Sequence, residues 1–473
     1  MSTSFIDKNS TALSVNQQAI WLEAKLHKNK PIFNIGSYAQ INGILDFEIL
    51  EQSIQNVISE NDALRIRIGS ISTIPEQFFE EKRNFTLKTH KFNALESAMN
   101  WMNKDFKSSV EIYSESLYSI SLVIAESQCF LYFKHHHIYI DGWSRAQLLQ
   151  KIAQHYNGIL SLIEVNTTSS YKSYLETINN SRIDLDQSIS FWKEEFSDIN
   201  RVSLFSKKNA ILQFAPSKRK RFVFPRDIYC KAQTDVKQDL KSKFYFLLAS
   251  LYVTLSRSTG NQEIIFGVPL LNRFNETQKL TIGYFVGLIP LRINFSPDTS
   301  FLEIVKGIQT KMRSTVSYRN IAVHEINKSV GINFSNSSQL YDVIFSFEPH
   351  NHDCKFGEFE VTHAGTFSSD FVQTPLVVHV QDFNEQDDIN FEFDYNLNYL
   401  SAGEVDVLIS RFKNLLHYYI GNTRALVGNA PVLLKEEHIK LHDFGTGLLK
   451  ELSSNNIISP ILDKALEYPD QVI

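Results

Sequence analysis

The sequence predicts an α/β protein, with mixed sheets covered by helices and arranged in two lobes. Apolar residues with helical spacing and with strand spacing alternate along both halves of the chain. The chain has 473 residues, more than one hydrophobic core usually organises. Residues 166–190 are rich in Ser, Asn and Thr and carry no strong apolar pattern. We therefore expect an N-terminal lobe over residues 1–175 and a C-terminal lobe over residues 176–430.

The first half supplies helices and strands in turn. Ser14 and Asp46 each precede an apolar stripe of helical spacing, and both residue types are favoured N-caps. The predicted helices cover residues 13–26, 46–58 and 143–156. The predicted strands cover residues 34–42 and 64–68 and two stretches between residues 119 and 137.

The second half repeats this style without repeating the sequence. Strands are predicted over residues 222–224, 264–268, 289–295, 341–347, 377–381 and 389–395, and helices over residues 244–255, 301–312 and 404–419. A cleft between two related lobes is the simplest architecture. Residues 431–473 are interpreted as a connector, and because the chain ends inside an unfinished element, we expect a longer parent polypeptide.

Composition excludes several classes of partner. The net charge is -5 and the only basic run, residues 218–221, is short, which argues against nucleic acid. The longest strongly apolar stretch, residues 244–255, is too short to cross a bilayer. Cys129, Cys230 and Cys354 lie far apart, which favours a reducing compartment. With a polar N-terminus that has no apolar signal core, the chain is expected to be cytoplasmic and not membrane-bound.

The residues with catalytic chemistry gather where a strand meets a turn and a helix. His137 and His136 are neighbours at a strand end and must face opposite sides of it. We expect His137 to face the cleft as a general base, because a free imidazole is mostly neutral near pH 7. His136 is expected to hold local structure. Asp141 and Gly142 follow on the turn, where Gly142 allows close approach of a ligand.

Three other interpretations of this segment stay open. His135, His137 and Asp141 could bind a metal, although no cysteine pair or second ligand cluster supports one. The histidines could also be ordinary core residues. Ser144 could be a nucleophile served by His137, although the Gly-x-Ser-x-Gly elbow is missing. Asp141 is so close to His137 in sequence that an ion pair is a better expectation for it than a catalytic triad.

This segment resembles a known family. Residues 136–142 match the His-His-x-x-x-Asp-Gly signature of nonribosomal peptide synthetase condensation domains, whose shorter core is shared with chloramphenicol acetyltransferase and CoA-dependent acyltransferases. Further segments resemble the family's motifs in the family's order. They are residues 13–21, residues 61–65 with the usual His and Glu changed, residues 282–292 with Gly287 replacing the usual Asn, and residues 341–347.

The resemblance implies a particular architecture. Two chloramphenicol-acetyltransferase-like lobes would form a V with a tunnel between them. Crossing elements would tie the lobes together, a floor loop in or next to residues 279–290 and a latch within residues 347–374. An ion pair between Asp141 and Arg292 would hold the histidine turn against the second lobe. Residues 431–473 would be the connector and the first residues of a downstream adenylation domain.

The resemblance also implies an activity. A donor acyl thioester and the amine of an acceptor aminoacyl thioester would join as an amide, both carried on 4'-phosphopantetheine of donor and acceptor peptidyl carrier domains. His137 and the backbone N–H of Gly142 would be the catalytic groups. Trp143, Ser144, Gly287 and Ser346 are the candidates for lining the tunnel. No metal and no covalently bound cofactor is expected, and the separated domain is expected to be a monomer.

Neighbouring subfamilies differ in their motifs. A heterocyclising domain would carry Asp-x-x-x-x-Asp in place of the histidines, and an epimerising domain would carry a Glu-x-His-Gly-Arg segment, which is missing here. Residues 141–156 look more like those of starter domains that accept an acyl group. Two alternatives remain, a non-catalytic domain of the same fold that recruits carriers or other partners, and a CoA-dependent acyltransferase.

Overall fold

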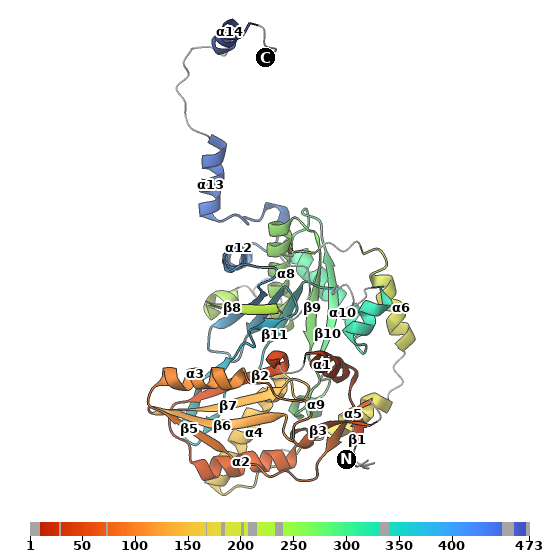
Figure 1. The fold of residues 1–473 in the computed structure, drawn as a ribbon, viewed down its shortest axis with the longest axis vertical. Helices are drawn as coiled ribbons and strands as arrows, with labels where there is room; N and C mark the ends of the chain where they lie inside the picture. The colour runs from red at the N-terminus through yellow and green to blue at the C-terminus, as the bar shows by residue number, and fades with distance from the viewer. Residues whose placement is uncertain are drawn as a thin grey trace. The chain divides into compact units, whose positions relative to one another are not determined.

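A computed structural model describes residues 10–27, 30–71, 74–166, 168–180, 185–199, 203–206, 215–231, 240–331, 340–446 and 458–469. Residues 1–430 form one compact unit and residues 431–473 a second one. The larger unit is built on a six-stranded sheet, a seven-stranded sheet and a small three-stranded sheet (Figure 1). The predicted α/β class with mixed sheets is confirmed.

The six-stranded sheet has the strand order β12-β13-β2-β7-β6-β5. Its strands are β2 (Asn34–Ile41), β5 (Lys88–Phe92), β6 (Tyr118–Ala125), β7 (Gln128–His136), β12 (Lys355–Phe356) and β13 (Phe359–Thr366). Helix α3 (Leu95–Phe106) lies on one side of β5, β6 and β7, and α2 (Phe47–Glu60) lies on the other side with α4 (Gly142–Ser161) packed against it (Figure 1).

Local sequence explains where these helices begin. The Ser14 side chain accepts from the Gln17 backbone N–H, and a reciprocal bond from Ser14 N to Gln17 completes a capping box at α1 (Val15–Leu26). Asp46 caps α2 through the Ile49 N–H at 3.0 Å. Both predicted N-caps are therefore confirmed. The stripe of Leu50, Ile54, Val57 and Ile58 on α2 is fully buried, so this face drives packing against the sheet.

The seven-stranded sheet has the order β10-β9-β11-β15-β16-β8-β14. Its strands are β8 (Ala215–Phe224), β9 (Glu263–Leu270), β10 (Gly287–Asn294), β11 (Val343–Glu348), β14 (Phe371–Val372), β15 (Leu376–Gln381) and β16 (Ile389–Asn396). Its helices include α8 (Leu240–Thr259), α10 (Phe301–Val316) and α12 (Ala402–Tyr419), and α8 contacts both of the others. Every predicted strand of the second half falls on one of these strands.

The remaining elements connect or flank the two large sheets. A three-stranded sheet contains β1 (Ser10–Ala12), β4 (Ile74–Phe79) and β3 (Ile66–Ile71), and only β3 overlaps a predicted strand. A 3-10 turn at Asp62–Arg65 replaces the first part of that predicted strand, residues 64–68. The polar stretch 166–190 contains helix α5 and the start of α6. The other helices are α5 (Tyr171–Asn180), α6 (Leu185–Glu195), α7 (Arg226–Lys231), α9 (Glu276–Leu280), α11 (Val323–Ser329), α13 (Lys435–Thr446) and α14 (Ile458–Glu467).

Two segments of the second half join the first sheet or its core. Strand β13 pairs with β2, from Val361 opposite Ile41 to Thr366 opposite Ser37. Ile282, Tyr284 and Phe285 pack into the hydrophobic core beneath the first sheet. These segments lie within the ranges predicted for the crossing elements. The sheet of the N-terminal lobe thus includes strands from outside residues 1–175.

The smaller unit, residues 431–473, contains α13 and α14, neither of which has a buried residue. Residues 447–457 and 470–473 of the predicted connector and adenylation-domain start lie outside the described residues. Within the described part of the chain, no helix combines the length and the apolar character that crossing a membrane requires.

Candidate active site

His137 lies directly after strand β7, which is paired on both sides. His136 at the end of β7 lies opposite Asn34 of β2, and the His137 backbone N–H donates to the Phe33 carbonyl at 2.7 Å. The chain then turns and begins α4 at Gly142. The histidine is therefore held by a rigid sheet while its side chain lies at an open end of it.

The half-buried His137 ring lines a cavity of about 450 Å³. Its Nδ1 lies 3.4 Å from the Ile140 carbonyl oxygen, and Tyr284 packs edge-on against the ring at 5.3 Å between centroids. A carbonyl oxygen only accepts, so the proton belongs on Nδ1 and the lone pair on Nε2. Burial lowers the pKa of His137 despite the Ile140 carbonyl and Asp141, so the ring is neutral at pH 7.

His136 faces the other side of the strand. It is 4% exposed, packs against Phe33 at 5.7 Å between ring centroids, and accepts through Nδ1 from the Ile138 N–H at 3.2 Å. Burial, with a smaller contribution from His137, lowers its pKa to about 3. A neutral imidazole that holds the following turn is a structural group, as the alternation along the strand predicts.

Asp141 is the N-cap of α4 and is fully buried. Its Oδ1 accepts from the Ser144 N–H at 2.8 Å and its Oδ2 accepts from the Phe285 N–H at 2.9 Å. The Arg273 guanidinium donates to both oxygens, at 2.7 Å to Oδ2 and 3.1 Å to Oδ1. Burial alone would raise the pKa of Asp141, but Arg273 and the two backbone donors outweigh it and hold the pKa below its usual value.

The predicted partner of Asp141 is wrong. Arg292 on β10 instead bonds to Glu263 and, at 2.6 Å, to Asp198. Glu263 lies two places along from the residue opposite Arg292 on β9, so the pair is an ordinary diagonal neighbour pair of a sheet. Arg273, in the loop after β9, carried no sequence signal that distinguished it from other arginines.

Two of the four predicted tunnel residues do not line the cavity. Ser144 is fully buried, and its Oγ donates to the Gly283 carbonyl at 2.6 Å and accepts from Arg273 Nη2 at 2.6 Å. It belongs to the Asp141 cluster, which also leaves it unfit as a nucleophile. Gly287 lies instead beside two asparagine side chains, where a Cβ would meet Asn272 Nδ2 at 2.8 Å and Asn16 Nδ2 at 2.9 Å. Both predictions are wrong because Ser144 faces Arg273 and Gly283, and Gly287 faces the two asparagines, so neither residue faces the cavity.

The other predicted wall residues do line the cavity, together with Gly142. Trp143 is fixed there by its indole N–H, which donates to the Lys279 carbonyl at 2.7 Å. The Ser346 hydroxyl donates to Glu348 at 3.1 Å. Gly142 is in tight contact with His350, since a Cβ added to Gly142 would lie 2.8 Å from the His350 ring.

Replacing Gly142 by Ala should therefore lower turnover, because the new methyl group displaces the buried His350 ring into the cavity. We expect a loss of about tenfold to a hundredfold, since a misplacement of about 1 Å can cost about 10²-fold in rate. Turnover of the variant under saturating substrate measures it. Gly403→Ala is the matched control, since this helical glycine has open space where its Cβ would be. A Gly142→Ala protein with full turnover would show that the close contact has no functional consequence.

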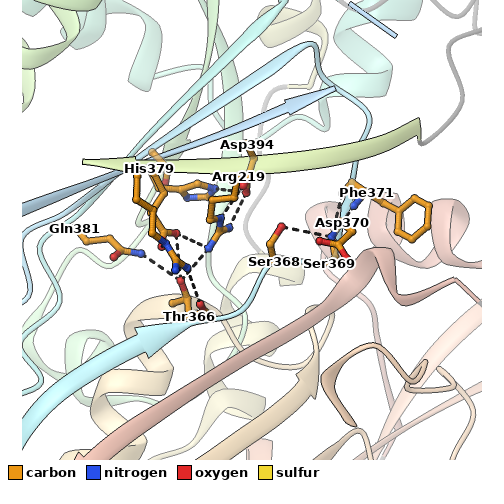
Figure 2. Close-up of polar contacts among 12 residues, drawn as sticks. Arg219, Thr366, Ser368, Ser369, Asp370, Phe371, His379, Gln381 and Asp394 are labelled. Carbon is orange, nitrogen blue, oxygen red and sulfur yellow. Dashed lines mark hydrogen bonds and ion pairs between the residues drawn. The ribbon is translucent and has the colours of Figure 1, made fainter. Parts of the chain in front are cut away.

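A charged network on the second sheet contributes to the wall of the same cavity, and sequence analysis missed it. His379 Nδ1 lies 2.8 Å from Glu348 and its Nε2 lies 3.6 Å from Asp394. Burial opposes the charge on this ring, but the two carboxylates outweigh it and raise the pKa of His379 to about 10. Arg219 forms a two-point bond with Asp394, at 2.6 Å for each contact (Figure 2).

The same network contacts the first sheet through Thr366 at the end of β13. The Thr366 hydroxyl accepts from Arg219 at 3.2 Å and from Gln381 at 3.4 Å (Figure 2). It also donates to Glu392 at 3.2 Å. A second cavity of about 420 Å³ lies beyond this cluster. The two cavities share the wall residues Arg219, Thr366, Phe367, Gln381 and Glu392.

No group of three His, Cys, Asp or Glu side chains within the described ranges could jointly hold a metal ion. His135 and Asp141, two of the three residues of the metal interpretation, are each held in other surroundings. His135 packs against Tyr139 at 6.2 Å between ring centroids, and Asp141 is committed to Arg273.

Comparison with known proteins decides the family. The sequence profile of the condensation domain matches residues 7–442. The chain belongs to the condensation domain family. Condensation domains of nonribosomal peptide synthetases are acyl-transferring enzymes that form amide bonds, so the predicted family, reaction and enzyme class are confirmed.

The relatives of this condensation domain are much longer proteins. A dimodular nonribosomal peptide synthase from Bacillus subtilis (strain 168) is 22% identical over 441 residues, which cover 91% of this chain and 18% of that protein. Surfactin synthase subunit 1 from the same organism is 24% identical over 454 residues, covering 90% of this chain and 12% of the relative. The chain thus spans less than a fifth of the length of these relatives.

Solved condensation domains share the fold. A variant of the starter condensation domain of rhizomide synthetase RzmA, in complex with C8-CoA, superposes with a TM-score of 0.79 at 20% identity, covering 89% of this chain and 97% of that one. The first condensation domain of the calcium-dependent antibiotic synthetase, in complex with a substrate analogue, gives a TM-score of 0.78 at 18% identity, covering 90% and 100%. These likenesses support the two-sheet architecture.

Proposed function

We propose that this condensation domain uses His137 to join a donor acyl group to the amine of an acceptor aminoacyl group. The observation that supports this role is the orientation of one imidazole. Its Nδ1 faces a backbone carbonyl, which leaves the basic Nε2 available in a cavity of about 450 Å³ that also exposes Gly142 and Trp143. The lowered pKa keeps the ring neutral and able to accept a proton.

The proposed reaction needs little activation of the donor, because a thioester is already reactive. The acceptor α-amine has a pKa of about 8, so part of it is neutral at physiological pH. Its nitrogen attacks the thioester carbon, and the ammonium of the tetrahedral intermediate gives its proton to Nε2 of His137. The intermediate collapses to the amide, and the thiolate that leaves takes the proton back. Aligning the two reactants is then the domain's main contribution to the rate.

The partners follow from this reaction. Both reactants would be carried on phosphopantetheine arms of donor and acceptor carrier domains, and an adenylation domain would follow in the same polypeptide. The donor is proposed to be an acyl group of the starter type, as residues 141–156 suggest. The two cavities that share the Thr366 wall would be the parts of the tunnel nearest to the reaction, with Gly142 N–H contacting the reacting groups.

Replacing His137 by Ala tests the proposal. Removing a proton-accepting group should lower the rate of amide formation by about 10²- to 10⁴-fold while the protein stays folded. Mass spectrometry of carrier-bound products, after mixing the domain with defined donor and acceptor carriers, measures the rate. His438→Ala in the connector unit is the control variant.

Near wild-type turnover by His137→Ala would remove this residue from the mechanism. Binding of both carriers by the wild-type domain without any product would instead favour the non-catalytic recruiting domain. Product formed only from free CoA thioesters would favour the CoA-dependent acyltransferase.

A further inference from the structure

A second arginine lies in the catalytic cavity, and the mechanism above does not use it. Arg145 is on helix α4 three residues after Gly142, so the two share a face of the helix. Its side chain lines the cavity of His137 and also a small neighbouring pocket between α4 and strand β2. Only 5% of Arg145 is exposed. A guanidinium so placed is nearly removed from water.

Within the described ranges, Arg145 has no ion-pair partner, unlike Arg219 in the same cavity and unlike Arg273, which does not line it. Its Nε is buried without a hydrogen bond, and among the described residues no carboxylate lies within ion-pair distance of it. Arg273 and Arg219, by contrast, each bind a carboxylate at two points. A buried charge is normally paired, and a guanidinium cannot escape the cost by losing its proton.

The surroundings of Arg145 do not cancel its charge. Its close titratable neighbours are neutral imidazoles, since burial together with the nearby Arg145 charge holds the pKa of His135 and His352 well below the usual value. Glu348 and Glu392 act favourably on the Arg145 charge from beyond ion-pair distance. Both are bound by other cations, Glu348 by His379 and Glu392 by Arg219 and Arg221. An anion that entered this part of the cavity would therefore meet a cation that has no ion-pair partner among the described side chains.

We propose that Arg145 binds a carboxylate carried by one of the two substrates, and that this domain selects an acidic donor or acceptor group. The planar guanidinium offers two parallel N–H donors to a carboxylate, which gives both affinity and orientation. The inference rests on the proposed function, because it assigns a substrate class to the same cavity. The bound carboxylate would also hold the reacting carbonyl at a fixed distance from His137.

Matched pairs of thioester probes test this inference and identify which substrate carries the anion. The donor pair is the glutaryl N-acetylcysteamine thioester and its neutral amide isostere. The acceptor pair is the aspartyl and asparaginyl N-acetylcysteamine thioesters. Calorimetric binding to the wild-type domain should favour the carboxylate in one pair by about tenfold or more, the discrimination expected of a buried charge pair. Arg145→Gln should abolish that preference and leave the affinity for the neutral probe unchanged.

Arg145→Lys provides a second variant, since it keeps the charge without the two-donor fork and should give an intermediate preference. Both variants should unfold at temperatures no lower than the wild type, because neither breaks an existing ion pair. Equal affinities within both pairs for the wild type, or a preference that survives in Arg145→Gln, would overturn the inference. Amide formation from the neutral probes judges the proposed function separately, because it depends on His137 and not on Arg145.

Discussion

Lowering the pH from 7.5 to 5.5 should reduce the free energy of unfolding of this condensation domain by at least about 1.4 kcal/mol. Four buried histidines around the cavity cause this loss, His135, His136, His350 and His352. Burial lowers the pKa of His136 to about 3 and of His350 to about 4, and it lowers those of His135 and His352 well below 6.5. The folded protein keeps these rings neutral.

The sign follows from which state binds protons. In the unfolded chain each of these rings takes up a proton below about pH 6.5, so stability is lost as the pH falls through that value, by about 1.4 kcal/mol per histidine over this range. His379 acts in the opposite direction, because its pKa is raised to about 10 and its contribution is fully present at low pH. It offsets the contribution of one histidine. His136 and His350 together with His379 therefore leave a net loss of about 1.4 kcal/mol, and the lowered pKa values of His135, His137 and His352 add to that loss.

Urea unfolding at pH 7.5, 6.5 and 5.5 measures this effect directly. His135→Leu removes one buried imidazole whose Nε2 has no partner, and it should reduce the loss by up to about 1.4 kcal/mol. An unfolding free energy that does not change between pH 7.5 and 5.5 would show that these rings titrate normally in the folded protein. Since a domain of ordinary stability has about 5 to 15 kcal/mol to lose, mild acid should remove a measurable part of the stability of this one.

Elements that local physics determines could be predicted from the sequence. Asp46 and Ser14 cap helices where predicted, because a side-chain oxygen beside a free N–H needs no distant partner. The two strands on either side of residues 126–127 pair as predicted, since both carry nearly continuous apolar runs joined by a short polar turn. The strand end at His137 could be predicted because the apolar run gives way there to a turn that contains Gly142.

Contacts between distant segments could not be predicted in the same way. Thr366 on β13 joins β2, more than 300 residues earlier in the chain, and nothing in either strand identifies the other. Arg273 and Arg292 are equally plausible partners for Asp141 in sequence, and only the fold decides between them. The charged wall did leave a signal, because Glu392 and Asp394 alternate with buried aromatic residues, which is the pattern of a strand with one polar face.

The buried pair of Asp141 and Arg273 should be the structural centre of the site, and breaking it should be severely destabilising. Arg273→Met leaves a fully buried carboxylate without its charge partner, and Asp141→Asn leaves the guanidinium equally unpaired. Each change should lower the free energy of unfolding by about 3 to 5 kcal/mol, the usual result of removing one member of a buried ion pair. Arg292→Met is the matched control and should cost clearly less, because Arg292 is bound to the exposed side chain of Asp198 and to a partly exposed Glu263.

A double-mutant cycle separates pairing from packing in this prediction. If the single changes are harmful because each leaves an uncompensated charge, the double variant Asp141→Asn with Arg273→Met should be more stable than the sum of the two losses implies. Its remaining loss then reports the Ser144 and Phe285 N–H groups, which still face residue 141 but no longer meet a carboxylate. Additive losses, or an Arg292→Met protein that is the less stable of the two arginine variants, would mean that the turn carrying His137 is held by packing and not by this ion pair.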